Sequence, residues 1–351
     1  MTTNDARPLR LGIVGYGAGG RYFHAPFVQA ADGVELVGIV ARSADKKAQV
    51  EAELPGVPTF DSLTDLLAAG VDAVTITTPP QTRHDLVLEA IAAGVHVVAD
   101  KPFAPTAAAA AELADAADEA GVVLGVYHNR RFDTDIRTLA AVVAGGELGD
   151  LWRFYSRFDL DEPGSIEAGP DGGLLRDMGT HVVDQAIWLL GDVAEVSAEL
   201  DWIDLPEGRT DAGFAITLRH TSGVTSYVSS SKANHVAARQ LLVYGSGGSY
   251  ESNGTDVQAA QIFSGRRPAA DKDGWGYEDE SRWGVLRTAA GDKPVPSEQG
   301  AYFEFYEQFA AAVRGEGPVP SDARAGVRTL AVLDAARRSA EQGGWQAPVV
   351  P

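Results

Sequence analysis

The glycine-rich stretch GYGAGG, residues 15–20, constrains the fold most, because it directly follows the apolar run LGIV. Its spacing fits G-x-G-x-x-G: Gly15 permits a tight turn, Gly17 lets the backbone approach a pyrophosphate, and Gly20 lets a helix pack closely on its strand. We expect Gly15, Tyr16, Gly17 and Gly20 to bind a dinucleotide at the N-terminus of that helix. A plain strand-to-helix turn is the alternative interpretation.

The first 126 residues alternate short β-branched runs with alanine-rich stretches of helical period. The runs are LGIVG, ELVGIV, DAVTIT, VHVVA and VVLGV. This alternation predicts βαβ units and a parallel sheet that helices cover on both faces. Because 351 residues exceed what one hydrophobic core usually serves, a second domain is expected after residue 126.

The second half of the chain has longer, half-polar runs, which indicate antiparallel strands with one covered face. They are WRFYSRFDL, VAEVSAELDW, AGFAITLRH, VTSYVSSS and RQLLVYG. Two helices are expected near residues 299–314 and 322–342. The acidic, Gly/Pro-rich segments 159–173 and 265–298 are expected to be loops.

Composition excludes several partners. The 29 Lys and Arg against 49 Asp and Glu give a net charge of −20, which repels nucleic acid and anionic lipid. No cysteine is present, so disulfides and thiolate metal sites are excluded. No apolar run approaches the about 18 residues of a transmembrane helix. The N-terminal stretch has no apolar signal core, and a cytoplasmic location is expected.

The stretch VGIVARSADKK, at the end of the second predicted strand, bears on the choice of cofactor. An acid commonly stands here when the ribose hydroxyls of NAD are bound, but this chain has Ala41, Arg42 and Ser43. An arginine suits the 2′-phosphate of NADP, which an acid would repel. NADP is therefore expected over NAD, whereas Lys46 and Lys47 are better explained as a solvated helix start.

Two polar groups interrupt apolar surroundings. In VVADKPF, residues 97–103, Lys101 ends a buried strand and is either a solvated strand end or a charge directed into a cleft. In residues 172–191, a helix would place Asp177, His181 and Asp184 on one stripe of a mostly apolar circumference. Buried polar side chains must be paired or functional, and an Asp177–His181 pair suits a general base.

These stretches together resemble the Gfo/Idh/MocA oxidoreductase family: GIVGYGAGG, ITTPPQTRH, AGVHVVADKPF and GGLLRDMGTHVVD stand in the family's order. GRYFHAPF, YHNRRFDTD and YSRFD are similar to the branch with NADP-dependent scyllo-inositol dehydrogenases. The resemblance implies a Rossmann domain over residues 1–126 and a substrate-binding and oligomerisation domain, with an open, mainly antiparallel sheet, over residues 127–351. The active site would lie between them.

The resemblance also implies roles for single residues. Lys101 would point into the crevice at the carboxyl end of its strand. Asp100 stands where the family usually has Glu, which puts its contact near the nicotinamide ribose in question. Further residues expected near the cofactor are Thr78, Pro79, His84 and Asn129, although His84 and Asn129 also suit local structural roles. His24 and Pro26 are expected to shape the first helix.

The expected reaction is reversible hydride transfer between the nicotinamide and a secondary alcohol of a cyclic polyol or sugar. His181 would take the hydroxyl proton, with a pKa within about a unit of the ordinary 6.5. Lys101 would stabilise the developing negative charge, and Asp177 would bind a neighbouring hydroxyl or orient His181. No metal site is expected, because the histidines and acids lack zincin-like spacing.

Two other functions share the fold: an NAD-dependent glycosidase, and a cofactor-sensing repressor without turnover. The intact set Lys101, Asp177 and His181 argues against the repressor, which needs no acid–base groups. Aromatic residues such as Trp152 and Tyr155 on the predicted second sheet indicate an interface. We therefore expect a homodimer or homotetramer formed through that sheet.

Overall fold

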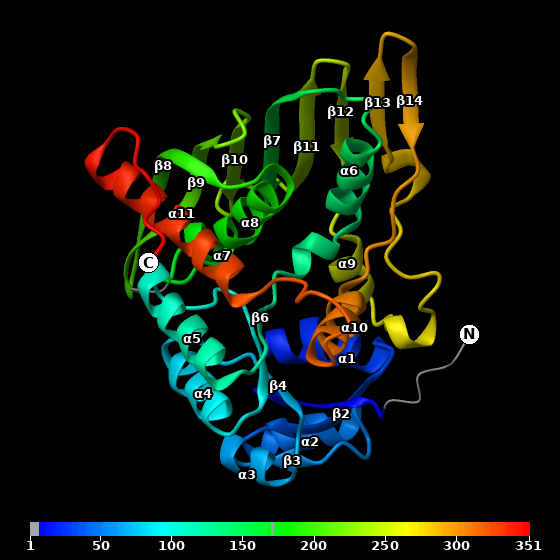
Figure 1. Cartoon of the computed structure of the whole chain (residues 1–351), viewed down its shortest axis with the longest axis vertical. Coiled ribbons are helices and arrows are strands. Elements are labelled where there is room, and N and C mark those ends of the chain that lie inside the picture. Colours follow the sequence, from blue (N-terminus) through cyan, green and yellow to red (C-terminus); the bar gives the residue numbers. More distant parts are fainter. Residues whose placement is uncertain (1–6, 170–171) are drawn as a thin grey trace.

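The computed structural model describes residues 7–169 and 172–351, and in these residues the chain forms two sheets (Figure 1). The first sheet is parallel and six-stranded, in the order β3-β2-β1-β4-β5-β6. The second has eight strands, in the order β14-β13-β12-β11-β7-β10-β9-β8, antiparallel except where β7 lies parallel to β10. The expected architecture, a Rossmann sheet followed by a mainly antiparallel sheet, is confirmed.

The first sheet consists of short, nearly continuous apolar strands, as a sheet with two covered faces requires. Its strands are β1 (Leu9–Val14), β2 (Val34–Val40), β3 (Thr59–Phe60), β4 (Ala73–Ile76), β5 (His96–Ala99) and β6 (Leu124–Val126). The helices between them are η1 (Gly19–His24), α1 (Ala25–Ala30), α2 (Ala44–Glu53), α3 (Leu63–Ala68), α4 (Pro80–Ala92) and α5 (Ala107–Ala120). The strand order reverses between β1 and β4, the place where open α/β sheets bind ligands.

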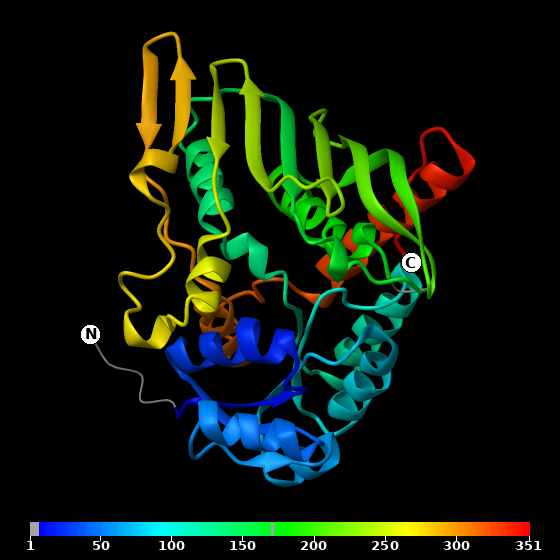
Figure 2. The same cartoon turned by 180° about the vertical axis from the view of Figure 1, so that it is seen from behind.

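The second sheet carries helices on one face, and seen from behind its strands lie in front of those helices (Figure 2). Its strands are β7 (Leu151–Asp159), β8 (Val193–Leu205), β9 (Gly208–His220), β10 (Thr225–Ser231), β11 (Ala238–Gly245), β12 (Gly248–Asn253), β13 (Gly284–Thr288) and β14 (Gly291–Val295). The prediction of a loop over residues 265–298 is wrong for β13 and β14. These strands form a hairpin at the edge of the sheet, where polar residues such as Asp292 and Lys293 are tolerated.

The remaining helices connect the sheets. They are η2 (Asn129–Phe132), α6 (Thr134–Ala144), η3 (Pro163–Ser165), α7 (Leu174–Asp177), α8 (Gly179–Leu190), α9 (Val257–Phe263), η4 (Pro268–Ala270), η5 (Glu280–Arg282), α10 (Tyr302–Val313) and α11 (Ala323–Gln342). The single helix expected within residues 172–191 is interrupted at Met178, between α7 and α8. Asp322 caps α11, its carboxylate accepting a hydrogen bond from the Ala325 backbone N–H at 2.6 Å.

Residues from the end of the chain return to the first sheet. Tyr302, Phe305 and Tyr306 of α10 are fully buried and share a core with Phe27 of α1 and Tyr127, which follows β6. The α11 helix lies beside α5 and the second sheet (Figure 1), and its apolar side belongs to the core that includes strands of both sheets. The first sheet therefore ends at residue 126, but α10 and α11, from the end of the chain, contribute to its core. None of the helices in the described ranges is long and apolar enough to cross a membrane.

The aromatic core between α10 and the first sheet gives a stability prediction. Phe305→Ala removes a fully buried ring that packs edge-on against Tyr127, with the ring centroids 4.9 Å apart. We expect the free energy of unfolding to fall by about 3–5 kcal/mol in denaturant titrations. Phe263→Ala, at a ring that is 62% exposed, is the control and should change it by less than about 1 kcal/mol. Equal losses would contradict this account of the core.

Candidate active site

The turn after β1 has the geometry of a dinucleotide-binding turn. Gly15 has a φ of +104°, and a Cβ on Gly20 would lie 2.2 Å from the Gly15 carbonyl oxygen, so both positions require glycine. A Cβ on Gly17 would meet nothing within 4 Å. The positive φ of Gly15 and the close contact at Gly20 fix the turn itself, whereas the open space beside Gly17 leaves room for a pyrophosphate at the start of the helix.

A cavity of about 650 Å³ lies along this turn and the end of β2. Seven of the predicted cofactor residues line it: Gly15, Tyr16, Gly17, Ala41, Arg42, Ser43 and Thr78. Arg42 is exposed, and in the part of the chain that the structure describes its guanidinium forms no ion pair. Ser43 also caps α2, accepting a hydrogen bond from the Lys46 backbone N–H at 3.3 Å. The shape and lining of the cavity fit a dinucleotide.

Six predicted cofactor residues do not line this cavity: Gly20, Pro79, His84, Asp100, Lys101 and Asn129. His84 projects from α4 toward Glu112, its Nε2 3.5 Å from the carboxylate, and it lines neither this cavity nor the second one described below. Asn129 is buried at the start of η2 and is not among the lining residues either. Pro79, which precedes α4, lines the second cavity. For His84 the geometry matches the local structural role that the sequence left open.

Arg83, beside His84, is a buried cation that the sequence reasoning missed. Its guanidinium donates to the carbonyl oxygens of Asp100 and Thr78, both at 2.6 Å, and to that of Pro102. The first and third of these carbonyls flank Lys101, whose peptide bond to Pro102 is cis. Arg83 therefore ties the loop after β4 to the turn that carries Lys101. A polar side chain at the start of an amphipathic helix gave no sequence signal for this role.

Asp100, at the position where the resemblance implies glutamate, contacts neighbouring protein groups. Its Oδ1 accepts a hydrogen bond from the Lys101 backbone N–H at 2.8 Å, and its Oδ2 lies 3.3 Å from Nε2 of the buried His24. Burial acts to raise the pKa of the Asp100 carboxyl, but His24, Arg83 and Lys101 outweigh it and lower the pKa. His24 thus does more than shape the first helix, because its imidazole supports the strand end that carries Lys101.

Lys101, at the end of β5, binds Asp177, the last residue of α7. Its Nζ lies 2.5 Å from Oδ1 of Asp177 and 3.2 Å from the Asp177 backbone oxygen. Lys232, directly after β10, binds the other carboxylate oxygen at 2.7 Å. Desolvation acts to raise the pKa of the Asp177 carboxyl, but the two ammonium groups hold the pKa well below its usual range. Lys232 was not predicted, because it follows an ordinary half-polar strand.

His181 is 4% exposed at the start of α8, and the expected pair with Asp177 is not formed, because both oxygens of Asp177 bind lysines. In the described residues its Nδ1 has no hydrogen-bond partner. Burial, followed by the charges of Lys101 and Arg130, lowers the pKa of His181 well below its usual value. The expectation of a pKa near 6.5 is therefore wrong: the imidazole is neutral at neutral pH, as a proton acceptor must be.

Asp184, the third member of the predicted stripe, is structural. Its carboxylate forms two bonds with Arg131, at 2.6 and 2.8 Å, and lies 2.8 Å from Nδ1 of His128. All three side chains are nearly buried, and Arg131 and His128 belong to the segment that follows β6. The stripe thus separates into two paired acids, Asp184 bound by Arg131 and Asp177 bound by the two lysines, with the buried His181 between them in sequence.

A second cavity, of about 300 Å³, opens beside Asp177 and Lys232. Its walls come from both domains, with Pro79, Gln81 and Pro102 on the Rossmann side and Gly173 and Leu174 on the other. Polar groups of both signs lie at one end of a small cleft. This arrangement suits a hydroxylated molecule, with a donor on Lys232 and an acceptor on Asp177; Lys101 and His181 are not among the lining residues.

The fold and this site define a dinucleotide-dependent oxidoreductase, and comparison with known proteins gives the same class. The family described as "Oxidoreductase family, NAD-binding Rossmann fold" matches residues 9–128, and the GFO/IDH/MocA C-terminal domain matches residues 136–251. The chain belongs to the Gfo/Idh/MocA oxidoreductase family.

Individual relatives cover nearly the whole chain. YdgJ, an uncharacterized oxidoreductase of Escherichia coli, is 33% identical over 95% of this chain and 96% of its own length. The NADP(+)-dependent scyllo-inositol 2-dehydrogenase IolW of Bacillus subtilis is 27% identical over 95% of this chain and 94% of its own. An oxidoreductase structure from Bacillus cereus superposes with a TM-score of 0.86 at 28% identity, covering 97% of this chain and 98% of that one.

The two kinds of glycine in the turn predict different effects. Gly17→Ala should leave the melting temperature of the cofactor-free protein unchanged, because its Cβ enters open space, yet weaken dinucleotide binding by about tenfold or more. Gly20→Ala should lower the melting temperature even without cofactor, because its Cβ meets the Gly15 carbonyl. Thermal melts and calorimetric titration with both dinucleotides measure this. The same pattern in both variants would contradict the assignment.

Proposed function

We propose that this protein is a dehydrogenase that transfers a hydride between a nicotinamide dinucleotide, preferably NADP, and a secondary alcohol of a cyclic polyol or sugar. The observation that carries the proposal is the contact between Lys101 and Asp177, whose Nζ and Oδ1 atoms lie 2.5 Å apart. The charge of Lys101 also lowers the pKa of His181, so the three residues share one electrostatic environment. The relationship to the scyllo-inositol dehydrogenase IolW supports the substrate class.

Each residue of the site has a task in this reaction. The bound nicotinamide supplies the hydride chemistry at carbon. His181, neutral in its buried position, accepts the hydroxyl proton as the carbonyl forms. Lys101 donates a hydrogen bond to the same oxygen and stabilises the negative charge that develops there. Asp177 accepts a hydrogen bond from a neighbouring hydroxyl and so orients the ring.

The preference for NADP rests on the end of β2. Arg42 is exposed at the cavity, carries no ion pair in the described residues, and follows Ala41 where an acid would select NAD. Asp61, one of three acids on the cavity wall together with Asp85 and Glu89, is paired with Lys47 at 2.6 Å. A guanidinium at this position suits the 2′-phosphate through charge-assisted hydrogen bonds.

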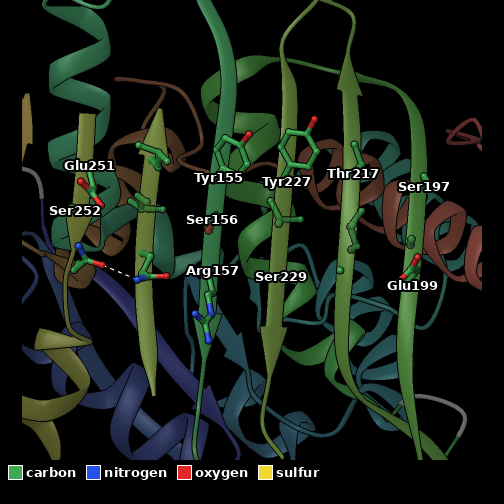
Figure 3. A pocket seen from close by; sticks show the side chains of 18 residues that line it. Tyr155, Ser156, Arg157, Ser197, Glu199, Thr217, Tyr227, Ser229, Glu251 and Ser252 are labelled. Carbon is green, nitrogen blue, oxygen red and sulfur yellow. Dashed lines mark hydrogen bonds between the residues drawn. The ribbon is translucent and has the colours of Figure 1, made fainter. Parts of the chain in front are cut away.

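The assembly we propose is a homodimer that meets through the open face of the second sheet, or a homotetramer built from two such dimers. Figure 3 shows Tyr155 and Tyr227 side by side on neighbouring strands of this face, with ring centroids 4.8 Å apart. Trp152 is 57% exposed and Tyr244 39% exposed on the same sheet. Apolar side chains gathered on a helix-free face favour a second sheet as their partner.

Turnover tests the reaction. Inositols, aldoses and ketoses are screened with both dinucleotides by the absorbance of the reduced nicotinamide, and we expect activity on at least one cyclic polyol or sugar. Lys101→Met should then lower kcat by about a hundredfold or more, because the developing charge loses its donor, and leave NADP affinity within about threefold. Lys293→Met, at an exposed lysine of β14, is the control. Near-normal turnover in Lys101→Met would contradict the assignment.

Cofactor choice has its own test. Arg42→Ala should reduce the ratio of kcat/KM for NADP over NAD by about tenfold or more, because the 2′-phosphate loses a charged partner. Lys293→Ala, at an exposed lysine of β14 that does not line the cavity, should leave the ratio nearly unchanged. An unchanged ratio in Arg42→Ala would refute this role.

The oligomer is tested by light scattering. At micromolar concentration we expect a mass of two or four chains, because a face with several exposed aromatic rings loses that exposure in the assembly. Tyr227→Glu, which places a charge beside Tyr155, should shift the mass toward the monomer. A monomeric wild type would refute the proposed assembly.

A further inference from the structure

Lys101 is held against Asp177 in the structure. It donates two of its three ammonium hydrogens, one to the carboxylate and one to the backbone oxygen of Asp177. When the ammonium group turns toward a substrate oxygen, its bond to the carboxylate is lost. The Asp177 carboxylate, 40% exposed in the cleft, would then keep its charge with one partner fewer. Once a substrate fills the cleft and displaces water, an unpaired carboxylate there is costly.

Lys232 is placed to supply the missing partner. Its Nζ lies 2.7 Å from the second oxygen of Asp177, and its side chain is only 8% exposed. The backbone is fixed as well: the Lys232 N–H donates to the Ala212 carbonyl at 3.1 Å, and the Lys232 carbonyl accepts from the Glu162 N–H at 3.3 Å. This lysine is thus held by the second sheet, whereas Lys101 comes from the first.

We propose that Lys232 is a positioning residue of the substrate site, which holds the Asp177 carboxylate in place while Lys101 turns from it to the substrate oxygen. The assignment rests on the proposed dehydrogenase function. Without Lys232, Lys101 is the ammonium partner of Asp177. The two side chains then bind each other more strongly, and Lys101 turns less readily to the substrate oxygen. With Lys232, the repulsion between the two ammonium groups also weakens the hold of Asp177 on Lys101.

Other charged groups near Asp177 have different partners. Arg176, which precedes it in α7, lies 3.9 Å from Asp334 of α11. Asp211 of β9 accepts from the Leu175 backbone N–H at 2.6 Å and pairs with Arg337. Glu167 is exposed at the rim of the same cavity. The two lysines are therefore the groups that bind the Asp177 carboxylate itself.

A double-mutant cycle tests the coupling. The wild type, Lys232→Met, Asp177→Asn and the double variant are compared by kcat with saturating NADP and a polyol found by the screen. We expect Lys232→Met to lower kcat by about tenfold or more in the wild type, but by less than about twofold in the Asp177→Asn background, because Lys232 acts through that carboxylate. Equal losses in both backgrounds, or none, would overturn the proposal.

Charge and shape are separated by further variants. Lys232→Arg keeps the charge and should retain most of kcat, whereas the neutral Lys232→Gln should lose it like Lys232→Met; these two also serve if the methionine variant does not fold. Lys293→Met controls for loss of a lysine in general. Loss of kcat in Lys232→Arg as large as in Lys232→Gln would show that shape matters rather than charge, and would overturn the proposal.

A measurement without turnover separates this inference from the proposed function. The carboxyl carbon resonance that disappears in Asp177→Asn identifies Asp177 in carbon-13 spectra. In the wild type it should stay ionised well below the ordinary carboxyl pKa of about 3.9, and in Lys232→Met it should titrate at higher pH. Identical titrations would overturn the role of Lys232. A wild type that turns over no polyol or sugar contradicts only the dehydrogenase assignment.

Discussion

The site depends on one buried carboxylate that fixes α8 to the segment directly following the last strand of the first sheet. Asp184 of α8 is bound by Arg131 and His128 from the segment that follows β6, so α8 is fixed against the carboxyl end of the first sheet. Burial acts to raise the pKa of this acid, but the contacts with Arg131 and His128 lower the pKa well below its usual range. Removal of one partner from a buried pair of this kind strongly destabilises the folded protein. Here the pair also sets the position of His181 relative to Lys101.

The three polar residues of the predicted stripe, in α7 and α8, have different partners. Asp184 takes the structural pairing, Asp177 takes both lysines, and His181 is left buried without an acid partner in the described residues. An imidazole without a carboxylate and near cations stays neutral, which suits a base. Arg83 and His24 contact Asp100 and so support the strand end that carries Lys101.

Much of this arrangement was predictable because it is local in sequence. The spacing of Gly15, Gly17 and Gly20 encodes the turn, and Lys101 at the end of a valine-rich strand could be placed at the edge of the sheet where ligands bind. Lys232 and Arg83 could not be placed, because their partners lie 55 residues away or are backbone carbonyls without a sequence signature. The break between α7 and α8 at Met178 was not predicted, because apolar residues recur at nearly the same spacing on both sides of it.

The central claim is that His181 is a neutral base whose pKa the buried site depresses. The most direct measurement is the pH profile of kcat/KM for polyol oxidation in the wild type and in His181→Asn. Since a lowered pKa keeps the imidazole neutral down to a pH well below its ordinary value of about 6.5, the wild-type profile should be flat through that pH, and His181→Asn should lie far below it throughout. A wild-type inflection near 6.5 that His181→Asn abolishes would contradict the depressed pKa. A variant that kept the wild-type plateau would contradict the base itself.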